Sequence, residues 1–280
     1  NKMQADLLYR SVDAHDLPCM ADIDSSLQYF CEEVSHSHKV VLTGECADEV
    51  FGGYPWFHRE EMLNSGTFPW TPSLTPRKVL LKDDLVKSLH MDEYVKKIYD
   101  RSVSEINVLP SENEIETNRR RIGYLNIRFF MQTLLNRMDR TSMFSGLEAR
   151  VPFADRKLVD YVFNIPWEMK AKDGLVKNIL RQASKGLLPD EILFRRKSPY
   201  PKTYNPYYEN LLAKRLKEVL ADSASPLHSL LDLKQVTQFL ENPKDYGAPW
   251  YGQLMAGPQM IAYLLQIEYF LRKYNVSIRI

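Results

Sequence analysis

The chain has 280 residues, with 37 Lys and Arg against 36 Asp and Glu, and 44% of it is hydrophobic. This length can bury a substantial core and hold one large domain or two small ones. The net charge of +1 gives no support for binding nucleic acid or a membrane surface, and no apolar run is long enough to span a bilayer. Three widely spaced cysteines, Cys19, Cys31 and Cys46, predict free thiols in a reducing compartment, so we expect a cytoplasmic protein.

Two amphipathic helices are predicted before the first strand. Residues 3–12 carry one apolar stripe, and a second helix is expected to begin at Asp24 or Ser25 as N-cap and to bury Phe30. The segment 24–26 (Asp-Ser-Ser) also looks like the tail of a Ser-Gly-Gly-x-Asp-Ser pyrophosphate loop. Neither the glycines nor a strand precedes it, so a helix cap is the better interpretation.

The stretch from Lys39 to Tyr54 carries the clearest signal of a site. A short apolar run at residues 40–42 predicts a buried strand, and the turn at Thr43-Gly44 leads to three acids, at positions 45, 48 and 49. In open parallel sheets, ligands bind beyond the carboxyl ends of the strands, where these acids would lie. The alternative is structural: Thr43 would be an N-cap, and the acids would face the helix dipole.

The rest of the chain predicts helices separated by proline-rich connections. Helical periodicity covers residues 77–108 and a long helix from 114 to about 138. Residues 135–155 mix opposite charges with apolar side chains and predict partly buried ion pairs that fix a loop. A helix is expected from Asp173, with Lys177 pointing inward or lying at the surface, and residues 259–273 predict an amphipathic docking helix.

Four blocks in chain order resemble the synthetase domain of glutamine-hydrolysing asparagine synthetases. They are Val41–Tyr54, Leu147–Asp155, Lys177–Arg181 and Leu188–Lys197, and the tail Trp250–Gln259 is similar to bacterial members. The resemblance implies the C-terminal part of an α/β adenine-nucleotide alpha-hydrolase-like (ATP-pyrophosphatase) domain. In this chain it would be mainly α, with residues 1–60 as an α/β remnant of the parallel sheet and residues 61–280 mostly helical.

The reaction that the resemblance implies is ATP-dependent formation of asparagine. Aspartate would be activated as β-aspartyl-AMP with the help of Mg²⁺ and then attacked by ammonia derived from glutamine. By position, the implied site residues are Thr43 and Gly44 for ATP, Asp48 for Mg²⁺, Glu45 and Lys177 for catalysis, and Tyr54 and Asp139 for the substrate. These residue types suit the chemistry, because Mg²⁺ prefers carboxylate oxygen, amine attack needs a base, and an anionic transition state needs a fixed cation.

Two departures from the family pattern set further expectations. Cys46 stands where glycine is usual, and the sequence contains neither the pyrophosphate loop nor an amino-terminal glutaminase with its nucleophilic cysteine. We therefore expect a fragment, inactive alone, whose sheet, phosphate cradle and nitrogen source lie upstream of Asn1, and a homodimer is one expected assembly. The alternatives are an adenylating, amide-forming relative of β-lactam synthetases and a non-catalytic helical module that binds a partner.

Overall fold

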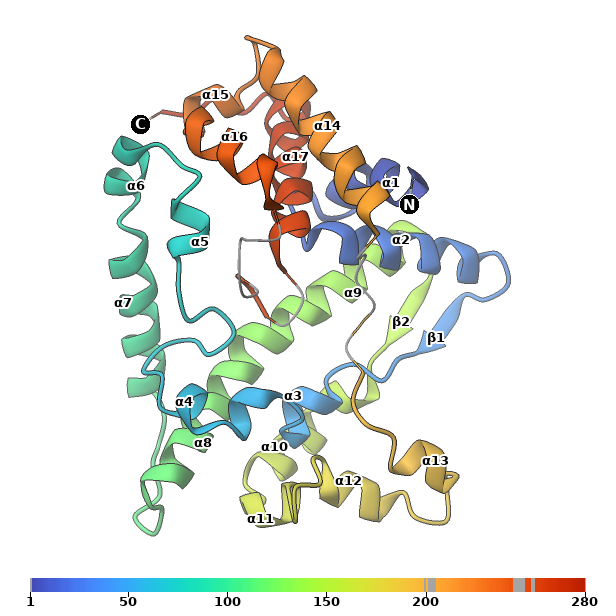
Figure 1. Ribbon diagram of the computed structural model, residues 1–280. Helices are drawn as coiled ribbons and strands as arrows, with labels where there is room; N and C mark the ends of the chain where they lie inside the picture. The colour runs from blue at the N-terminus through green and yellow to red at the C-terminus, as the bar shows by residue number, and fades with distance from the viewer. Residues whose placement is uncertain (1, 199, 201–204, 244–249, 253–254, 280) are drawn as a thin grey trace.

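The computed structural model describes residues 2–198, 200, 205–243, 250–252 and 255–279, and it is mostly helical with one small sheet (Figure 1). In chain order the elements are α1 (Lys2–His15), α2 (Ala21–Ser35), β1 (Val40–Leu42), α3 (Ala47–Phe51), η1 (Pro55–Phe57), α4 (Glu60–Leu63), α5 (Thr75–Lys78), α6 (Asp83–Leu89), α7 (Met91–Ser104), α8 (Glu114–Leu125), η2 (Asn126–Met131), α9 (Gln132–Phe144), β2 (Glu148–Arg150), η3 (Pro152–Ala154), α10 (Arg156–Phe163), α11 (Trp167–Lys170), α12 (Asn178–Ala183), α13 (Asp190–Leu193), α14 (Pro206–Ala221), α15 (Leu227–Leu230), α16 (Leu233–Glu241) and α17 (Gly257–Lys273). Among the described residues, no helix combines the length and the apolar character needed to cross a membrane.

The sheet consists of β1 and β2, which run parallel with Val41 opposite Ala149. The expectation of a parallel sheet remnant is confirmed, but the sequence placed residues 148–150 in a loop, which is wrong. The strand has no apolar signal in the sequence, because the charged side chains of Glu148 and Arg150 point to solvent and only the small Ala149 between them turns inward. The outer face of β1 is also exposed, with Leu42 at 74%.

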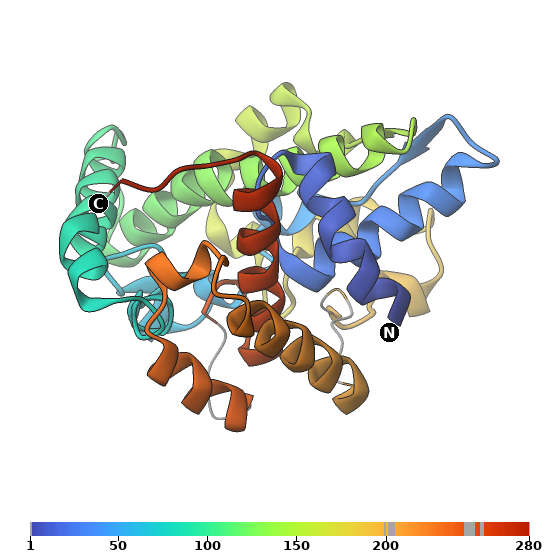
Figure 2. The same cartoon turned by 90° about the horizontal axis from the view of Figure 1, so that it is seen from above.

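The largest core surrounds α17, which runs through the upper part of the molecule in Figure 1 and through the middle of the view in Figure 2, beside α1 and α14. The predicted C-terminal helix is confirmed, and it buries more than one stripe. Its fully covered side chains include Ile261 and Leu265, between the predicted positions Met260 and Leu264. A helix that is buried on several sides is a central helix of the core, whereas a surface helix packs along one face only.

The second predicted helix exists but differs in its start and in its buried face. It begins at Ala21 with Met20 as N-cap, and Asp24 lies inside the first turns, where its carboxylate accepts a hydrogen bond from the Met20 N–H at 2.7 Å. Phe30, expected to be buried, is 60% exposed, and Cys31 takes the inward position instead. The cap prediction failed because the aspartate reaches back to the cap from within the helix.

The long central helix is predicted correctly but runs further and changes its winding. It continues from α8 through η2 to α9, and η2 is a π-helical turn. Two neighbours in this turn enter different cores: Phe130 packs against Trp56, and Met131 packs in the cluster of Phe51. The buried Asn126 donates a hydrogen bond from Nδ2 to the Glu49 carbonyl at 3.2 Å, which fixes α3 against the turn.

Candidate functional site

The segment after β1 turns sharply before it becomes helical. Cys46 has φ = 70°, in the left-handed region, and is the N-cap of α3 without a side-chain cap hydrogen bond. The interpretation of Thr43 as N-cap is therefore wrong. A non-glycine residue in this conformation costs about 1–2 kcal/mol, which explains why glycine would suit this position.

Asp48 in the first turn of α3 lies between two lysines that come from distant parts of the sequence. Its Oδ1 is 2.9 Å from Lys177 Nζ, and its Oδ2 is 3.1 Å from Lys197 Nζ. Burial opposes the ionisation of Asp48, but Lys197 and Lys177 outweigh it and hold the pKa of the carboxyl below its usual value. Two ammonium groups are thus concentrated around one carboxylate at the end of the strand.

Gly53 allows the backbone to approach this carboxylate closely. A Cβ at position 53 would overlap Asp48 Oδ1, and the Gly53 N–H donates to the Asp48 carbonyl at 2.8 Å. Any larger residue would have to displace Asp48 from its lysines. Gly53, the second glycine of the pair that marked the turn in the sequence, is therefore a packing requirement of the site.

Glu45 is held by a second buried ion pair. Arg137 Nη2 of α9 donates to Glu45 Oε1 at 2.6 Å, and Arg137 Nε lies 3.9 Å from Asp24 Oδ1. Burial raises the pKa of Glu45, and Arg137 only partly offsets this effect. Glu45 Oε2 is also buried, and it has no hydrogen-bond partner among the described residues. One oxygen of Glu45 is thus fixed by Arg137, while the other is free to take a proton.

Tyr54 supports the lysine side of the site. Its hydroxyl donates to the buried Glu49, its ring stacks on Trp56 with centroids 4.2 Å apart, and Lys197 Nζ lies 3.7 Å from the centre of its ring. A cation over an aromatic face is attracted by the ring quadrupole. The Tyr54 ring therefore fixes the position of the Lys197 ammonium.

These groups surround a single cavity of about 370 Å³. The predicted residues Gly44, Glu45, Asp48 and Tyr54 all line it, together with Arg137, Lys197 and others. A Cβ built at Gly44 would meet no atom within 4 Å, so there is free space at the mouth of the turn. The cavity thus combines cations, a candidate general base and an aromatic side chain. This combination suits an anionic ligand that carries a reacting carbonyl or phosphoryl group.

The remaining predicted residues lie at different distances from the cavity. Lys177 reaches Asp48 not from within a helix, as expected, but as the N-cap of α12 at φ = 56°. Thr43 continues the sheet, since its N–H donates to the Arg150 carbonyl at 2.9 Å, and its buried Oγ1 has no hydrogen-bond partner within the described part of the chain. Asp139 is exposed on α9, outside the residues described as lining the cavity.

Arg137 and Lys197 were not predicted to belong to the site, although Arg137 lay in the segment expected to form partly buried ion pairs, and Glu49 was expected there only as one of three acids. Lys197 stood in the fourth block, and Arg137 stood in the charge-rich segment, so both were visible as residue types. Lys197 lies 149 positions from its partner Asp48, and Arg137 lies 92 positions from its partner Glu45. One sequence contains no signal that pairs positions so far apart.

Mg²⁺ fits this donor set only together with a phosphate ligand. Mg²⁺ sites at substrate phosphates use one or two protein carboxylates. Here Asp48 supplies one, since Glu45 is paired with Arg137 and Glu49 accepts from Tyr54. Lys177 and Lys197 already occupy both oxygens of Asp48, so Asp48 is free for the metal only when phosphate oxygens take over the lysines.

Comparison with known proteins gives one consistent result. A profile of the asparagine synthase family matches residues 2–272. Asparagine synthetase [glutamine-hydrolyzing] 3 of Bacillus subtilis is 49% identical over 274 residues, which are 98% of this chain and 44% of that protein. Asparagine synthetase [glutamine-hydrolyzing] 1 of the same organism is 28% identical over 80% of this chain and 40% of its own length, and the human asparagine synthetase is 42% identical over 67 residues. The chain spans less than half the length of these relatives.

Proposed function

This chain belongs to the asparagine synthase family, and on that premise we propose that it carries the amide-forming site of an enzyme that makes asparagine from aspartate with ATP. The observation that carries the proposal is the cavity beyond β1, where Asp48 lies between two lysines and Glu45 lies beside Arg137. In this proposal the aspartate side chain is activated as its acyl-adenylate, and ammonia, derived from glutamine, displaces AMP.

Lys177 and Lys197 would act in the first half-reaction. With ATP in the cavity, their ammonium groups leave Asp48 for the phosphate oxygens, where fixed cations lower the energy of the developing negative charge. Asp48 would then hold Mg²⁺, and the ion would supply positive charge for the pyrophosphate. Thr43 and Gly44, at the open end of the turn, would line the adenosine site.

Glu45 would act in the second half-reaction as the base that takes a proton from the attacking ammonia. Its raised pKa improves it as a base, and Arg137 keeps its Oε1 in place while Oε2 has no hydrogen-bond partner among the described residues. Tyr54 would shape the aspartate pocket through Lys197. A role for Asp139 would require it to turn toward the cavity from the exposed side of α9.

The test uses a hybrid protein in which this chain replaces the matching residues of the B. subtilis asparagine synthetase 3. We expect the hybrid to exchange pyrophosphate into ATP only with aspartate, and to form asparagine. Glu45→Gln should keep the exchange and lose asparagine formation by roughly a hundredfold or more, because proton removal contributes about that much. Lys177→Ala should lower both reactions by a comparable factor.

The control is Lys172→Ala, which removes an exposed lysine five residues away and should change neither reaction. Equal loss of both half-reactions in Glu45→Gln would remove Glu45 from the role of base. Normal exchange in Lys177→Ala would show that this lysine serves Asp48 alone. A hybrid that uses another carboxylic acid in place of aspartate would contradict the proposed substrate.

A further inference from the structure

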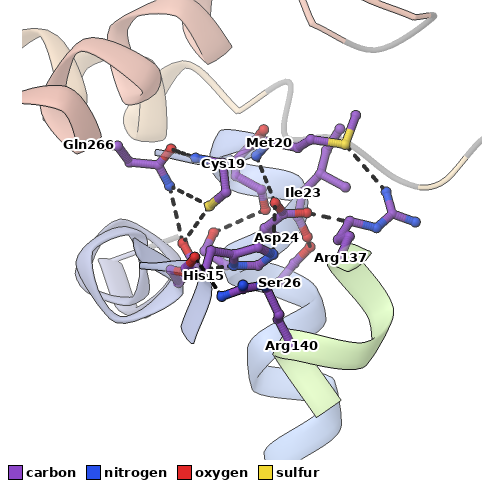
Figure 3. A network of polar contacts seen from close by, with 12 residues as sticks. His15, Cys19, Met20, Ile23, Asp24, Ser26, Arg137, Arg140 and Gln266 are labelled. Carbon is purple, nitrogen blue, oxygen red and sulfur yellow. Dashed lines mark hydrogen bonds and ion pairs between the residues drawn. The ribbon is translucent and has the colours of Figure 1, made fainter. Parts of the chain in front are cut away.

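A second group of chemically reactive side chains lies in the core where α1, α2 and α17 meet (Figure 3). His15 ends α1, Cys19 lies in the connection, and Asp24 lies in the first turns of α2. One ligand atom of each residue, a ring nitrogen, the thiol sulfur and a carboxylate oxygen, lies within 4.8 Å of the other two. His15 and Asp24 are buried, and Cys19 is half-buried.

The hydrogen bonds of His15 leave one ring nitrogen bare. Nδ1 lies 2.8 Å from the Ser11 carbonyl, which can only accept, so Nδ1 carries the proton. Nε2 is buried, and among the described residues it has no hydrogen-bond partner. A metal-binding histidine is commonly fixed in this way, with its other N–H donated to a backbone carbonyl.

Nε2 faces the Asp24 carboxylate at a separation that suits a metal ion better than a proton. Nε2 is 3.8 Å from Asp24 Oδ2, which is beyond the reach of a hydrogen bond. Two acceptors that face each other across this gap repel unless a cation lies between them. Two ligands of a tetrahedral ion, each about 2.0–2.1 Å from it, stand about 3.4 Å apart, so a small inward movement would complete the geometry.

The charges of the surrounding groups balance when a divalent ion is added. The Cys19 thiolate and Asp24 would neutralise the ion, and Arg137 and Glu45 already neutralise each other. Without an ion and with the thiol protonated, Asp24, Arg137 and Glu45 leave one uncompensated negative charge in a buried region, which is unfavourable. Gln266 Nε2, 3.2 Å from Cys19 Sγ, would donate to the thiolate from α17.

We propose that His15, Cys19 and Asp24 form a binding site for a zinc ion, with a water molecule as the fourth ligand. The mixture of imidazole nitrogen, thiolate sulfur and carboxylate oxygen suits zinc, since magnesium and calcium take oxygen ligands. The ion would tie α1 to α2 and, through Gln266, to α17. The three ligands do not line the cavity of the proposed reaction, although Arg137 contacts Asp24 on one side and Glu45 on the other, and the proposal does not depend on that function.

The experiment is a titration of the metal-free chain with Co²⁺ as a spectroscopic probe, followed by displacement with Zn²⁺. We expect one Co²⁺ per chain, visible bands of tetrahedral intensity and a thiolate-to-cobalt charge-transfer band in the near ultraviolet. Cys19→Ser should abolish the charge-transfer band, and His15→Gln should weaken binding at least tenfold, as loss of one ligand does. Cys31→Ser alters a buried thiol in α2 that does not belong to the cluster, and it should leave the spectrum unchanged.

A second measurement does not depend on how the variants fold. X-ray absorption at the zinc edge of the unaltered chain should show one sulfur ligand near 2.3 Å with nitrogen and oxygen ligands at about 2.0–2.1 Å. The thermal midpoint of the same sample should rise with Zn²⁺ concentration, because the ion binds the folded state. Absence of stoichiometric binding, a zinc shell without sulfur, or a charge-transfer band that persists in Cys19→Ser and disappears in Cys31→Ser would overturn the proposal.

Discussion

The buried ion pair between Arg137 and Glu45 makes a stability prediction that can be tested without any activity. Arg137→Met removes the cation that pairs with Glu45 and that also lies 3.9 Å from Asp24. The side chains of Arg137 and Glu45 are only 13% and 18% exposed, so water cannot replace the lost partner well. Breaking such a pair costs about 3–5 kcal/mol.

The share of that cost due to Glu45 has an upper limit, because the carboxylate can take up a proton instead. For an unfolded-state pKa of about 4.3, protonation at pH 7 costs about 3.7 kcal/mol, and at pH 5 it costs about 1 kcal/mol. Without Arg137, the folded-state pKa of Glu45 rises further above its unfolded value. The stability linked to protonation is then complete below about pH 4.3 and is lost as the pH rises through the folded-state pKa.

We therefore expect Arg137→Met to be less destabilising at pH 5 than at pH 7, by up to about 2.7 kcal/mol. In that background, Glu45→Gln should restore about 3–4 kcal/mol at pH 7, because the amide carries no charge. In the unaltered chain the same change should have a small effect, since burial and Arg137 act on Glu45 in opposite directions. The measurement is urea denaturation, at pH 5 and pH 7, of the unaltered chain, Arg137→Met, Glu45→Gln and the double variant.

Arg156→Met is the matched control, because the pair of Arg156 with Asp160 is 94% and 70% exposed. It should change stability little at either pH, as exposed pairs do. The reasoning is refuted if Glu45→Gln has the same effect with and without Arg137, or if Arg137→Met costs the same at pH 5 and pH 7.

Two further predictions concern the turn and the sheet. Cys46→Ala should lower the free energy of unfolding by about 1 kcal/mol, because burial of the side chain is lost. Cys46→Gly should regain much of this, because glycine avoids the cost of about 1–2 kcal/mol of the left-handed backbone. Calorimetry that finds the glycine variant less stable than the alanine variant would show that the backbone at position 46 is not strained. Because β1 has one described partner strand and Leu42 is 74% exposed, we expect self-association and dye binding that Leu42→Lys reduces, and that Leu187→Lys, at an equally exposed leucine outside the sheet, does not. Light scattering measures the self-association, and a monomer that binds no hydrophobic dye would contradict this prediction.

Much of the helical content could be predicted from the sequence, because apolar periodicity is a local property. The same locality explains the errors. Residues 148–150 carry two outward charges, so only their pairing with β1 makes them a strand. Phe30 had the right spacing for burial, but nothing in the described residues covers that side of α2.

The candidate site divides in a similar way. Glu45, Asp48 and Tyr54 lie within ten residues of one another, and a turn between a strand and a helix brings them to one cavity. Lys177 was predicted from its motif, but its inward direction comes from a left-handed cap rather than from a helix face. Arg137 and Lys197 became part of the site only through tertiary contacts, and the role of Asp139 stays a prediction.

The π-helical turn η2 has a consequence for how Arg137 is aimed. In a regular helix each residue advances the side-chain direction by about 100°, so the wider turn resets the phase of everything that follows it. Phe130 and Met131 anchor that turn in two different cores, and α9 begins from there with a fixed rotational setting. Inserting a single residue between Met131 and Arg137 would leave Arg137 in the helix, yet its side chain would point about 100° away from Glu45. The orientation of this guanidinium thus depends on the number of residues that separate Arg137 from η2, and not only on the contacts that Arg137 itself makes.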